Sequence, residues 1–474
     1  MRTLRHGVGW LVASWPALSS AHGFGERYDL PIPLGYFVLG ACATVLLTWA
    51  VALRMGHRHG PSSEGWILPI DLHQPALMFV RRLCQGVGLG LLWLTTWAAL
   101  AGTGDPLMNL APTWIWIIWW IGLSLWSALV GPVWPALDPW RSLYEGLQFL
   151  ARRLGFSRLS LGWSWPQGLG VWPAVLGLLA WNWLEVVYAL PSSPHRVGWA
   201  ILGWSALQLA GMCCFGRATW QEHADVFALY FRHLSRMAPL QITDGGRRIS
   251  IGALGHGWHR PEDYPVGSVG LVIAMLATVL FDGVHSSAYW LVFQGGLEHA
   301  IPMALDVNGH VAGALGLLGV WGVLALAYGW TCGITAYGFK GLSRGEVAQV
   351  FLPTLIPIAV GYLLAHNYSG LVIQGQHVVA LLSDPLGRQW NVWGSAGQPI
   401  DITWADARTT WYVALWAIVS GHVIAVWWSH RLALLHWSEL RLAKQACLPL
   451  TLLMVGYTAI SLILLAQPLV EPAG

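Results

Sequence analysis

Ten apolar stretches, each long enough to cross a lipid bilayer, divide this sequence. A bilayer-spanning helix needs about 20 predominantly apolar residues. The stretches lie at residues 33–53, 83–103, 110–131, 172–190, 198–216, 266–282, 311–331, 349–366, 410–429 and 448–467. Inside the hydrocarbon region, only helices and closed barrels satisfy all of their backbone hydrogen bonds. The pattern therefore predicts an all-α fold, a polytopic integral membrane helix bundle of about ten transmembrane helices.

The composition excludes a soluble protein of this length. Charged residues make up only 10% of the 474 residues, whereas an average globular protein contains about 25%. The formal net charge of +3 also excludes a nucleic-acid-binding chain. The lipid bilayer is the partner that the composition predicts, and other membrane subunits are compatible with it.

The N-terminal segment has two interpretations. Arg2 and Arg5 precede an apolar run at residues 8–18, and small residues at 19–21 precede His22. This arrangement is typical of a cleaved signal peptide, but a short eleventh helix that stays in the chain fits equally well. We therefore assign residues 1–21 to a signal peptide or short N-terminal helix, and residues 22–474 to a single transmembrane bundle.

The basic residues predict the orientation of the bundle. Nineteen of the 25 Lys and Arg side chains fall at every second connection between the apolar stretches. The alternate connections hold only Arg27, Arg196, Arg388 and Arg408. Because cytoplasmic loops collect Lys and Arg, we expect a bacterial-type inner (plasma) membrane protein. Its mature N- and C-termini would both lie on the outer side.

Three segments outside the ten stretches are also expected to contact the membrane. Residues 288–305 and 369–394 are interpreted as re-entrant or interfacial pieces on the outer side, and their sequences LVFQG at 291–295 and LVIQG at 371–375 resemble each other. This echo suggests a duplicated unit of the kind found in transporters. On the cytoplasmic side, 217–264 is expected to form an amphipathic helix on the headgroups, over residues 217–240, followed by a polar loop.

Acidic and amide side chains form the first candidate site, a site for a small solute or ion. Glu185 lies inside a predicted transmembrane helix, where an ionisable group is a functional hypothesis by default. Asp282 ends another predicted helix near the outer face. Gln294 and Gln374 lie in the two outer segments and complete the predicted substrate-binding set. A structural role for Glu185 and an ordinary Asp-Gly turn at Asp282 are the alternatives.

Histidines form the second candidate site. The chain has 18 histidines, and imidazole is a ligand for copper, zinc and iron. A cut after residue 21 would make His22 the mature N-terminus, able to chelate copper through its amine and ring. Helix caps and core contacts are the alternative roles. The predicted metal ligands, for copper or haem, are His22, His285, His299, His366, His377 and His422.

The 33 tryptophans exceed what aromatic belts at the two membrane surfaces explain. Those at residues 114–126 indicate either helix packing or a cavity for a quinone, a porphyrin or a lipid tail. No catalytic motif of a known enzyme class occurs. Three functions remain: transporter-like binding and permeation of a small solute or ion near the outer face, a metal- or haem-binding subunit of a copper-handling or redox system, and a non-catalytic membrane scaffold subunit.

Overall fold

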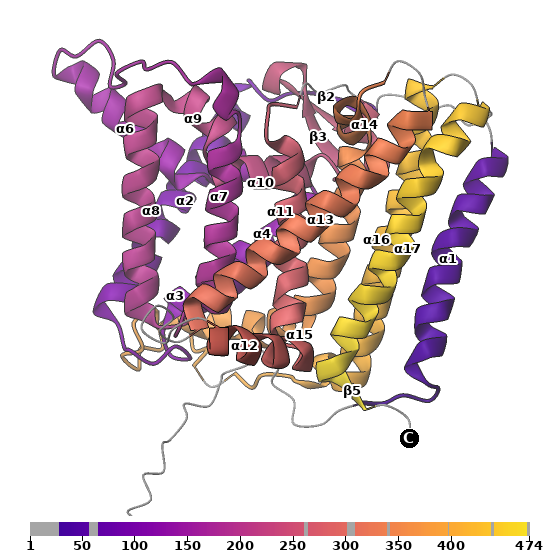
Figure 1. Ribbon diagram of the computed structural model, residues 1–474. Helices are drawn as coiled ribbons and strands as arrows, with labels where there is room; N and C mark the ends of the chain where they lie inside the picture. The colour runs from indigo at the N-terminus through magenta and orange to yellow at the C-terminus, as the bar shows by residue number, and fades with distance from the viewer. Residues whose placement is uncertain are drawn as a thin grey trace, which may run out of the picture.

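The structure is a computed structural model that describes residues 28–55, 65–259, 264–300, 309–338, 342–396, 398–437 and 440–471. Within these ranges the chain is an all-α membrane bundle, as the sequence predicts. Nine helical segments are long and apolar enough to cross a bilayer, and they run roughly along one direction in a single bundle (Figure 1). They are α1 (Leu34–Met55), α2 (Pro75–Ala101), α3–η2–α4 (Leu110–Leu129), α8 (Pro194–Phe215), α11 (Ser268–His285), α13 (His310–Gly338), α14–η8–α15 (Arg344–Ser383), α16 (Ala407–His436) and α17 (Leu440–Leu469).

A tenth crossing is made by a shorter apolar segment, α7 (Trp172–Asn182) continued by the π-helical turn η4 (Trp183–Val187). The pairing of the two chain ends supports this count. Strand β1 (Tyr28–Asp29) pairs in parallel with β5 (Val470–Glu471), so both ends of the described chain lie at the same end of the bundle. An even number of crossings is needed to bring them there, and ten segments supply it. Each of the ten predicted stretches corresponds to one of these segments.

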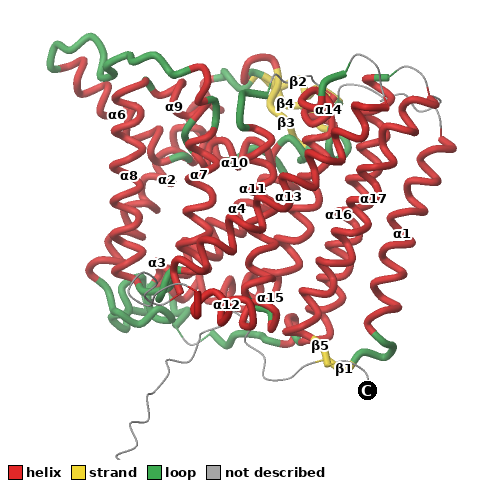
Figure 2. Tube along the Cα trace, in the orientation of Figure 1, coloured by secondary structure: helices red, strands yellow, loops and turns green. Residues whose placement is uncertain are grey.

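The two ends of the bundle differ in structure. At one end, here called the α12 end, helix α12 (Ala288–Ala300) lies across the ends of its neighbours beside β1 and β5 (Figures 1 and 2). At the opposite end, here called the sheet end, three short strands form an antiparallel sheet in the order β2–β4–β3. These strands are β2 (Trp66–Asp71), β3 (Leu240–Thr243) and β4 (Arg248–Ile251).

Short helices join the crossings. At the sheet end, α6 is strongly amphipathic, with Arg152 and Arg153 in its last turn. The short helices are α5 (Trp134–Leu137), α6 (Pro139–Arg153), α9 (Arg217–His223), α10 (Val226–Ser235) and α14 (Arg344–Phe351), with single turns η3 (Gln167–Leu169), η5 (Asp244–Gly246), η6 (His256–His259), η8 (Leu352–Leu355) and η9 (Thr403–Ala405).

The segment predicted as one amphipathic helix over 217–240 is two helices, and the second does not lie on the headgroups. The Asp225 carboxylate accepts hydrogen bonds from the backbone N–H groups of Phe227 and Ala228. It therefore caps α10 and separates this helix from α9. Helix α10 packs against α4 and α7, and eight of its ten residues are buried. Even its histidine, His233, is only 4% exposed.

The expected break near residue 366 is also absent, because α15 runs without interruption from Ile356 to Ser383. Residues 369–383 therefore continue this helix and do not form a separate outer segment. Residues 288–300, by contrast, form α12, which lies at the end of the bundle (Figure 1). The two similar sequences thus occupy different positions. Residues 291–295 lie in α12, across the end of the bundle, and residues 371–375 lie within the long crossing helix α15.

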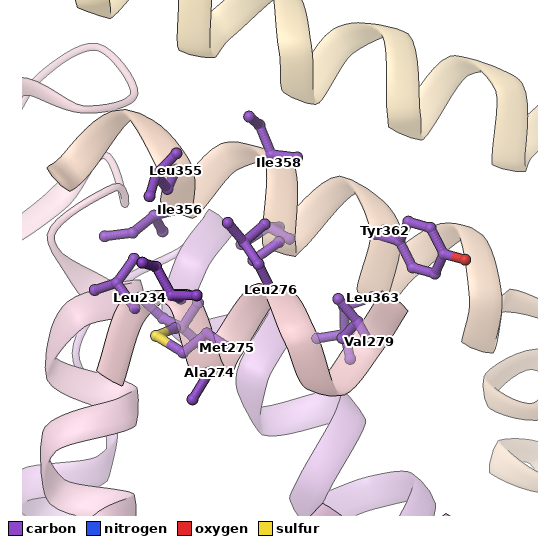
Figure 3. Packing of buried hydrophobic residues seen from close by; sticks show 14 of the residues in the cluster. Leu234, Ala274, Met275, Leu276, Val279, Leu355, Ile356, Ile358, Tyr362 and Leu363 are labelled. Atoms are coloured by element: carbon purple, nitrogen blue, oxygen red, sulfur yellow. The ribbon is translucent and has the colours of Figure 1, made fainter. Parts of the chain in front are cut away.

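The buried core lies where α15 contacts α11 and α16. Figure 3 shows Val279 of α11 beside Leu363 of α15, within the buried cluster that also contains Leu276 and Tyr362. Helices α15 and α16 approach closely at Gly361 and Gly421, where a Cβ atom on Gly361 would lie 2.5 Å from the Ala417 carbonyl oxygen. Small residues are what allow membrane helices to pack this tightly. The crossing fixes the positions of the polar residues on both helices.

Two buried carboxyls at the sheet end give a prediction about pH. Burial raises the pKa of Asp225 above its ordinary value of 3.8, and the nearby Asp138 raises it further. The folded protein therefore binds this proton more tightly than the unfolded chain does. The resulting stabilisation is complete at low pH and is lost as the pH rises through the raised pKa. The free energy of unfolding should fall by about 1 kcal/mol or more between pH 5 and pH 9.

Asp225→Asn keeps a side-chain oxygen that can cap α10, but its amide group cannot ionise. This variant should flatten the pH dependence, measured as the thermal unfolding midpoint of the purified protein. Asp244→Asn, which replaces an exposed carboxylate at the same end, is the control and should keep it. An Asp225→Asn protein with the wild-type pH profile would contradict the assignment.

Candidate functional site

An acid–histidine pair joins two of the crossing helices. The Asp282 Oδ2 atom on α11 lies 2.7 Å from the His366 Nε2 atom on α15. The imidazole is 8% exposed and the carboxylate is 26% exposed. Asp282 stands three residues before the end of α11, near the α12 end of the bundle. The pair is therefore buried between helices on its histidine side and partly accessible on its aspartate side.

A second carboxyl lies near this pair, on a third crossing segment. Glu185 belongs to the π-helical turn η4, and such turns interrupt α-helices frequently at functional sites. Its Oε2 atom accepts a hydrogen bond of 3.1 Å from the Trp120 indole N–H. Asp282 lies close enough for the two carboxyl groups to interact electrostatically. The structure thus brings together two of the predicted site residues, Glu185 and Asp282, with His366.

Carboxyl and imidazole groups gather at this place in the bundle. A second imidazole, that of His285, also lies within electrostatic range of Asp282. Charged side chains inside a membrane are costly unless they pair or take up a proton. The arrangement can therefore hold a proton shared between carboxyl and imidazole groups.

A buried hydroxyl lies beside the acid–histidine pair. Tyr362 stands one helical turn before His366, and its hydroxyl has no hydrogen-bond partner among the described residues. A Cβ atom at position 283 would lie 2.1 Å from this hydroxyl oxygen, so Gly283 is what lets the tyrosine approach α11. Because Gly283 follows Asp282 directly, the hydroxyl lies close to the acid, and the two groups interact electrostatically.

Two further polar side chains continue from Tyr362 into the bundle. Tyr457 on α17 is 8% exposed, and its ring centroid is 5.8 Å from that of His422 on α16. His422 is 1% exposed and lies in the middle of its 30-residue helix. The Tyr457 hydroxyl and the His422 Nε2 atom have no partner among the described residues. Asp282, Tyr362, Tyr457 and His422 therefore form a series of polar groups inside an otherwise apolar core.

The hydrogen bond of His422 defines which of its nitrogens can accept a proton. Its Nδ1 atom lies 2.9 Å from the Ile418 carbonyl oxygen. A carbonyl oxygen only accepts, so Nδ1 carries the hydrogen and donates it. The Nε2 atom of the neutral ring is then a lone-pair acceptor at the centre of the bundle.

The predicted glutamines lie apart from the acids. Gln294 is on α12 at the end of the bundle. Gln374 stands eight residues beyond His366 on α15, which separates the two by about 12 Å along the helix axis. Their membership of the site stays a prediction. Gln374 was expected in the site because residues 369–394 were predicted to be a separate outer segment, whereas it lies on α15, the same helix as His366.

The predicted metal ligands are spread over several helices. His285 packs between Phe281 and Trp290, His366 pairs with Asp282, and His422 lies near Tyr457. His377 is on α15 beyond the pair. Residues 1–21 and His22 lie outside the described residues. His299 is described only as part of the α12 backbone. Within the described part of the chain, no group of three or more His, Cys, Asp or Glu side chains could hold a metal ion.

Three residues of the site were not predicted from the sequence: Trp120, Tyr362 and Tyr457. Buried tyrosine and tryptophan side chains are common in membrane helices, so their residue type alone gives no signal. Gly283, next to the predicted acid Asp282, was the one nearby sequence feature that indicated a close approach between helices.

Comparisons of this chain with protein-family models, with curated proteins and with solved structures give no match.

Proposed function

We propose that this multi-pass membrane protein is a proton-coupled transporter of a small solute or ion, and that Glu185, Asp282 and His366 form its proton-binding site. The observation that carries the proposal is the 2.7 Å contact between Asp282 and His366 with a second carboxyl in electrostatic range. Carboxyl and histidine chains inside membranes are typical of proton relays in pumps and transporters. Carboxyl and imidazole groups gathered inside a membrane can share a proton, which supports this assignment.

We further propose that this proton moves inward along the series of buried polar groups. Asp282 is the most accessible member and provides entry from the α12 end. Tyr362 and Tyr457 can each donate and accept a hydrogen bond, and His422 Nε2 can accept a proton at the centre of the bundle. No hydrogen bond joins Tyr362, Tyr457 and His422 Nε2 among the described residues, so transfer along the series requires water molecules or side-chain movement between them.

The proposed orientation places the α12 end outside the cell. Arg196, Arg388 and Arg408 are the described basic residues at the connections of this end. The sheet end carries most of the Arg and Lys side chains, including those of α6 and the strands. Because basic residues mark the cytoplasmic side, we propose an inner (plasma) membrane protein whose β1 and β5 ends face outward. The proton site would then lie in the outer half of the membrane.

Proton flux in reconstituted vesicles tests the proposal. Purified protein in liposomes loaded with a pH-sensitive dye should dissipate an imposed pH gradient faster than protein-free liposomes. If flux depends on a co-transported solute, adding candidate solutes to the outside should accelerate it. Absence of protein-dependent flux, with and without a panel of ions, amino acids and sugars, would overturn the proposal and favour a scaffold role.

A further inference from the structure

A second feature of the bundle lies away from the proton site. A cavity of about 490 Å³ opens between α2, η2–α4 and α8. Its wall is almost entirely apolar, and indole rings supply much of it, among them Trp119, Trp126, Trp181 and Trp204. The volume falls in the range of ligand pockets, about 300–1,000 Å³. Part of the tryptophan excess in the sequence therefore surrounds a space instead of filling the contacts between helices.

The cavity is elongated along the helices. It follows η2 and α4 from Trp114 to Trp126, and α8 from Arg196 to Trp204. These distances correspond to roughly 12–18 Å along a helix axis. Val87 and Trp126, which belong to the wall, are 46% and 52% exposed, so the cavity opens sideways toward the surrounding lipid. A long, narrow, apolar space with a lateral opening fits a hydrocarbon chain.

One cation stands at the α12 end of this cavity. Arg196 is part of the wall, and its guanidinium carbon lies 5.1 Å from the centre of the Tyr188 ring. The guanidinium also donates a hydrogen bond to the Ala189 carbonyl. Among the described ion pairs, Arg196 has no acidic partner. It lies in the first turn of the spanning helix α8, and lipid headgroups surround the ends of spanning helices.

We infer that this cavity binds one hydrocarbon chain of an anionic membrane lipid, whose phosphate contacts Arg196. The apolar wall accounts for the chain, and the cation accounts for the charge of the headgroup. A neutral lipid would gain the same apolar contacts without the electrostatic attraction. Free phosphate would lack the apolar contacts. One Arg near the membrane surface strengthens the binding of an anionic lipid about fivefold.

Quenching of tryptophan fluorescence by brominated lipids tests this inference. Delipidated protein in dodecyl maltoside should be titrated with phosphatidylglycerol that carries brominated chains, and separately with the matching phosphatidylcholine. Tryptophans on the outer surface are quenched by either lipid, so the difference between the two curves reports the cavity. We expect half-maximal quenching at about a fivefold lower concentration of phosphatidylglycerol.

Two pairs of variants separate the headgroup from the chain. Arg196→Gln should remove the preference for phosphatidylglycerol, whereas Arg388→Gln should keep it. Arg388 is a matched control, because it lies at the same end and also donates to a backbone carbonyl, that of Ala101. Ala200→Phe places a ring in the cavity wall and should reduce the saturable quenching by both lipids. Ala206→Phe, on an exposed position of the same helix, should not.

The inference is overturned by any of three results. These are equal quenching of the wild-type protein by the two lipids, an Arg196→Gln protein that keeps the preference, and an Ala200→Phe protein that is quenched like the wild type. Each variant alters an exposed position, and a monodisperse elution profile confirms that it is folded. None of the measurements depends on transport, so the inference is tested independently of the proposed function.

Discussion

Replacing Glu185 with glutamine should lower the proton flux of reconstituted protein by about tenfold or more. The variant keeps a side-chain oxygen that can accept the hydrogen bond from the Trp120 indole, 3.1 Å long in the wild type. It therefore preserves the contact between η4 and η2 while removing the group that binds the proton. Groups that transfer protons directly contribute about 10²–10⁴-fold to rates in enzymes, so a tenfold loss is a conservative expectation. Flux is measured with the same dye-loaded vesicles at equal protein density.

Glu145→Gln is the matched control for this experiment. Glu145 lies on α6 at the sheet end, is 38% exposed, and pairs with Arg141 and Arg217. Exposed pairs of this kind contribute about 0–1 kcal/mol to stability, so the control should fold and transport like the wild type. A Glu185→Gln protein with wild-type flux would remove Glu185 from the site, even if protein-dependent flux itself were present.

The crossing segments were predictable because a membrane imposes its length on the sequence. All ten predicted stretches correspond to described segments, including the short one at 172–190, which becomes Trp172–Val187. The small β-sheet was not predicted. Its strands have four to six residues, and such short strands leave no alternating pattern that stands out in loops between apolar helices.

The missed continuity of α15 has a physical cause. His366, Asn367 and Tyr368 are three successive polar residues, and by hydropathy they look like the end of a transmembrane helix. In the structure each has a partner: His366 pairs with Asp282, the Asn367 amide donates to the Leu363 carbonyl, and the Tyr368 hydroxyl donates to the Trp404 carbonyl. Satisfied polar groups can stay within a helix that continues through the membrane. Hydropathy alone cannot indicate these partners, because two of them come from distant segments.

The candidate site was predictable only in part for a related reason. Glu185 and Asp282 could be selected singly, because acidic side chains in membrane helices are rare. Their association with His366 depends on which helices are neighbours, and α11 and α15 are separated by α12, α13 and α14 in the sequence. The burial of α10 likewise depends on tertiary contacts, since its aromatic face predicts a membrane surface and a protein core equally well.

The close crossing of α15 and α16 gives the prediction with the largest expected effect on stability. A Cβ atom on Gly361 would lie 2.5 Å from the Ala417 carbonyl oxygen, and one on Gly421 would lie 2.6 Å from the Pro357 carbonyl oxygen. Both obstacles are backbone atoms of a neighbouring helix, so no side chain can rotate away to make room. Gly361→Val should therefore force the helices apart and destabilise the protein by about 3 kcal/mol or more.

Gly375→Val on the same helix is the control, because a Cβ atom there would meet nothing within 4 Å. The two variants introduce the same residue into the same helix, so their intrinsic helix propensities cancel. The measurements are the monodisperse fraction by size-exclusion chromatography and the thermal unfolding midpoint. Equal midpoints for the two variants would show that the crossing tolerates separation. If the crossing does open, His366 on α15 and His422 on α16 move apart, so any Gly361→Val protein that can be purified should also lose proton flux although both histidines are intact.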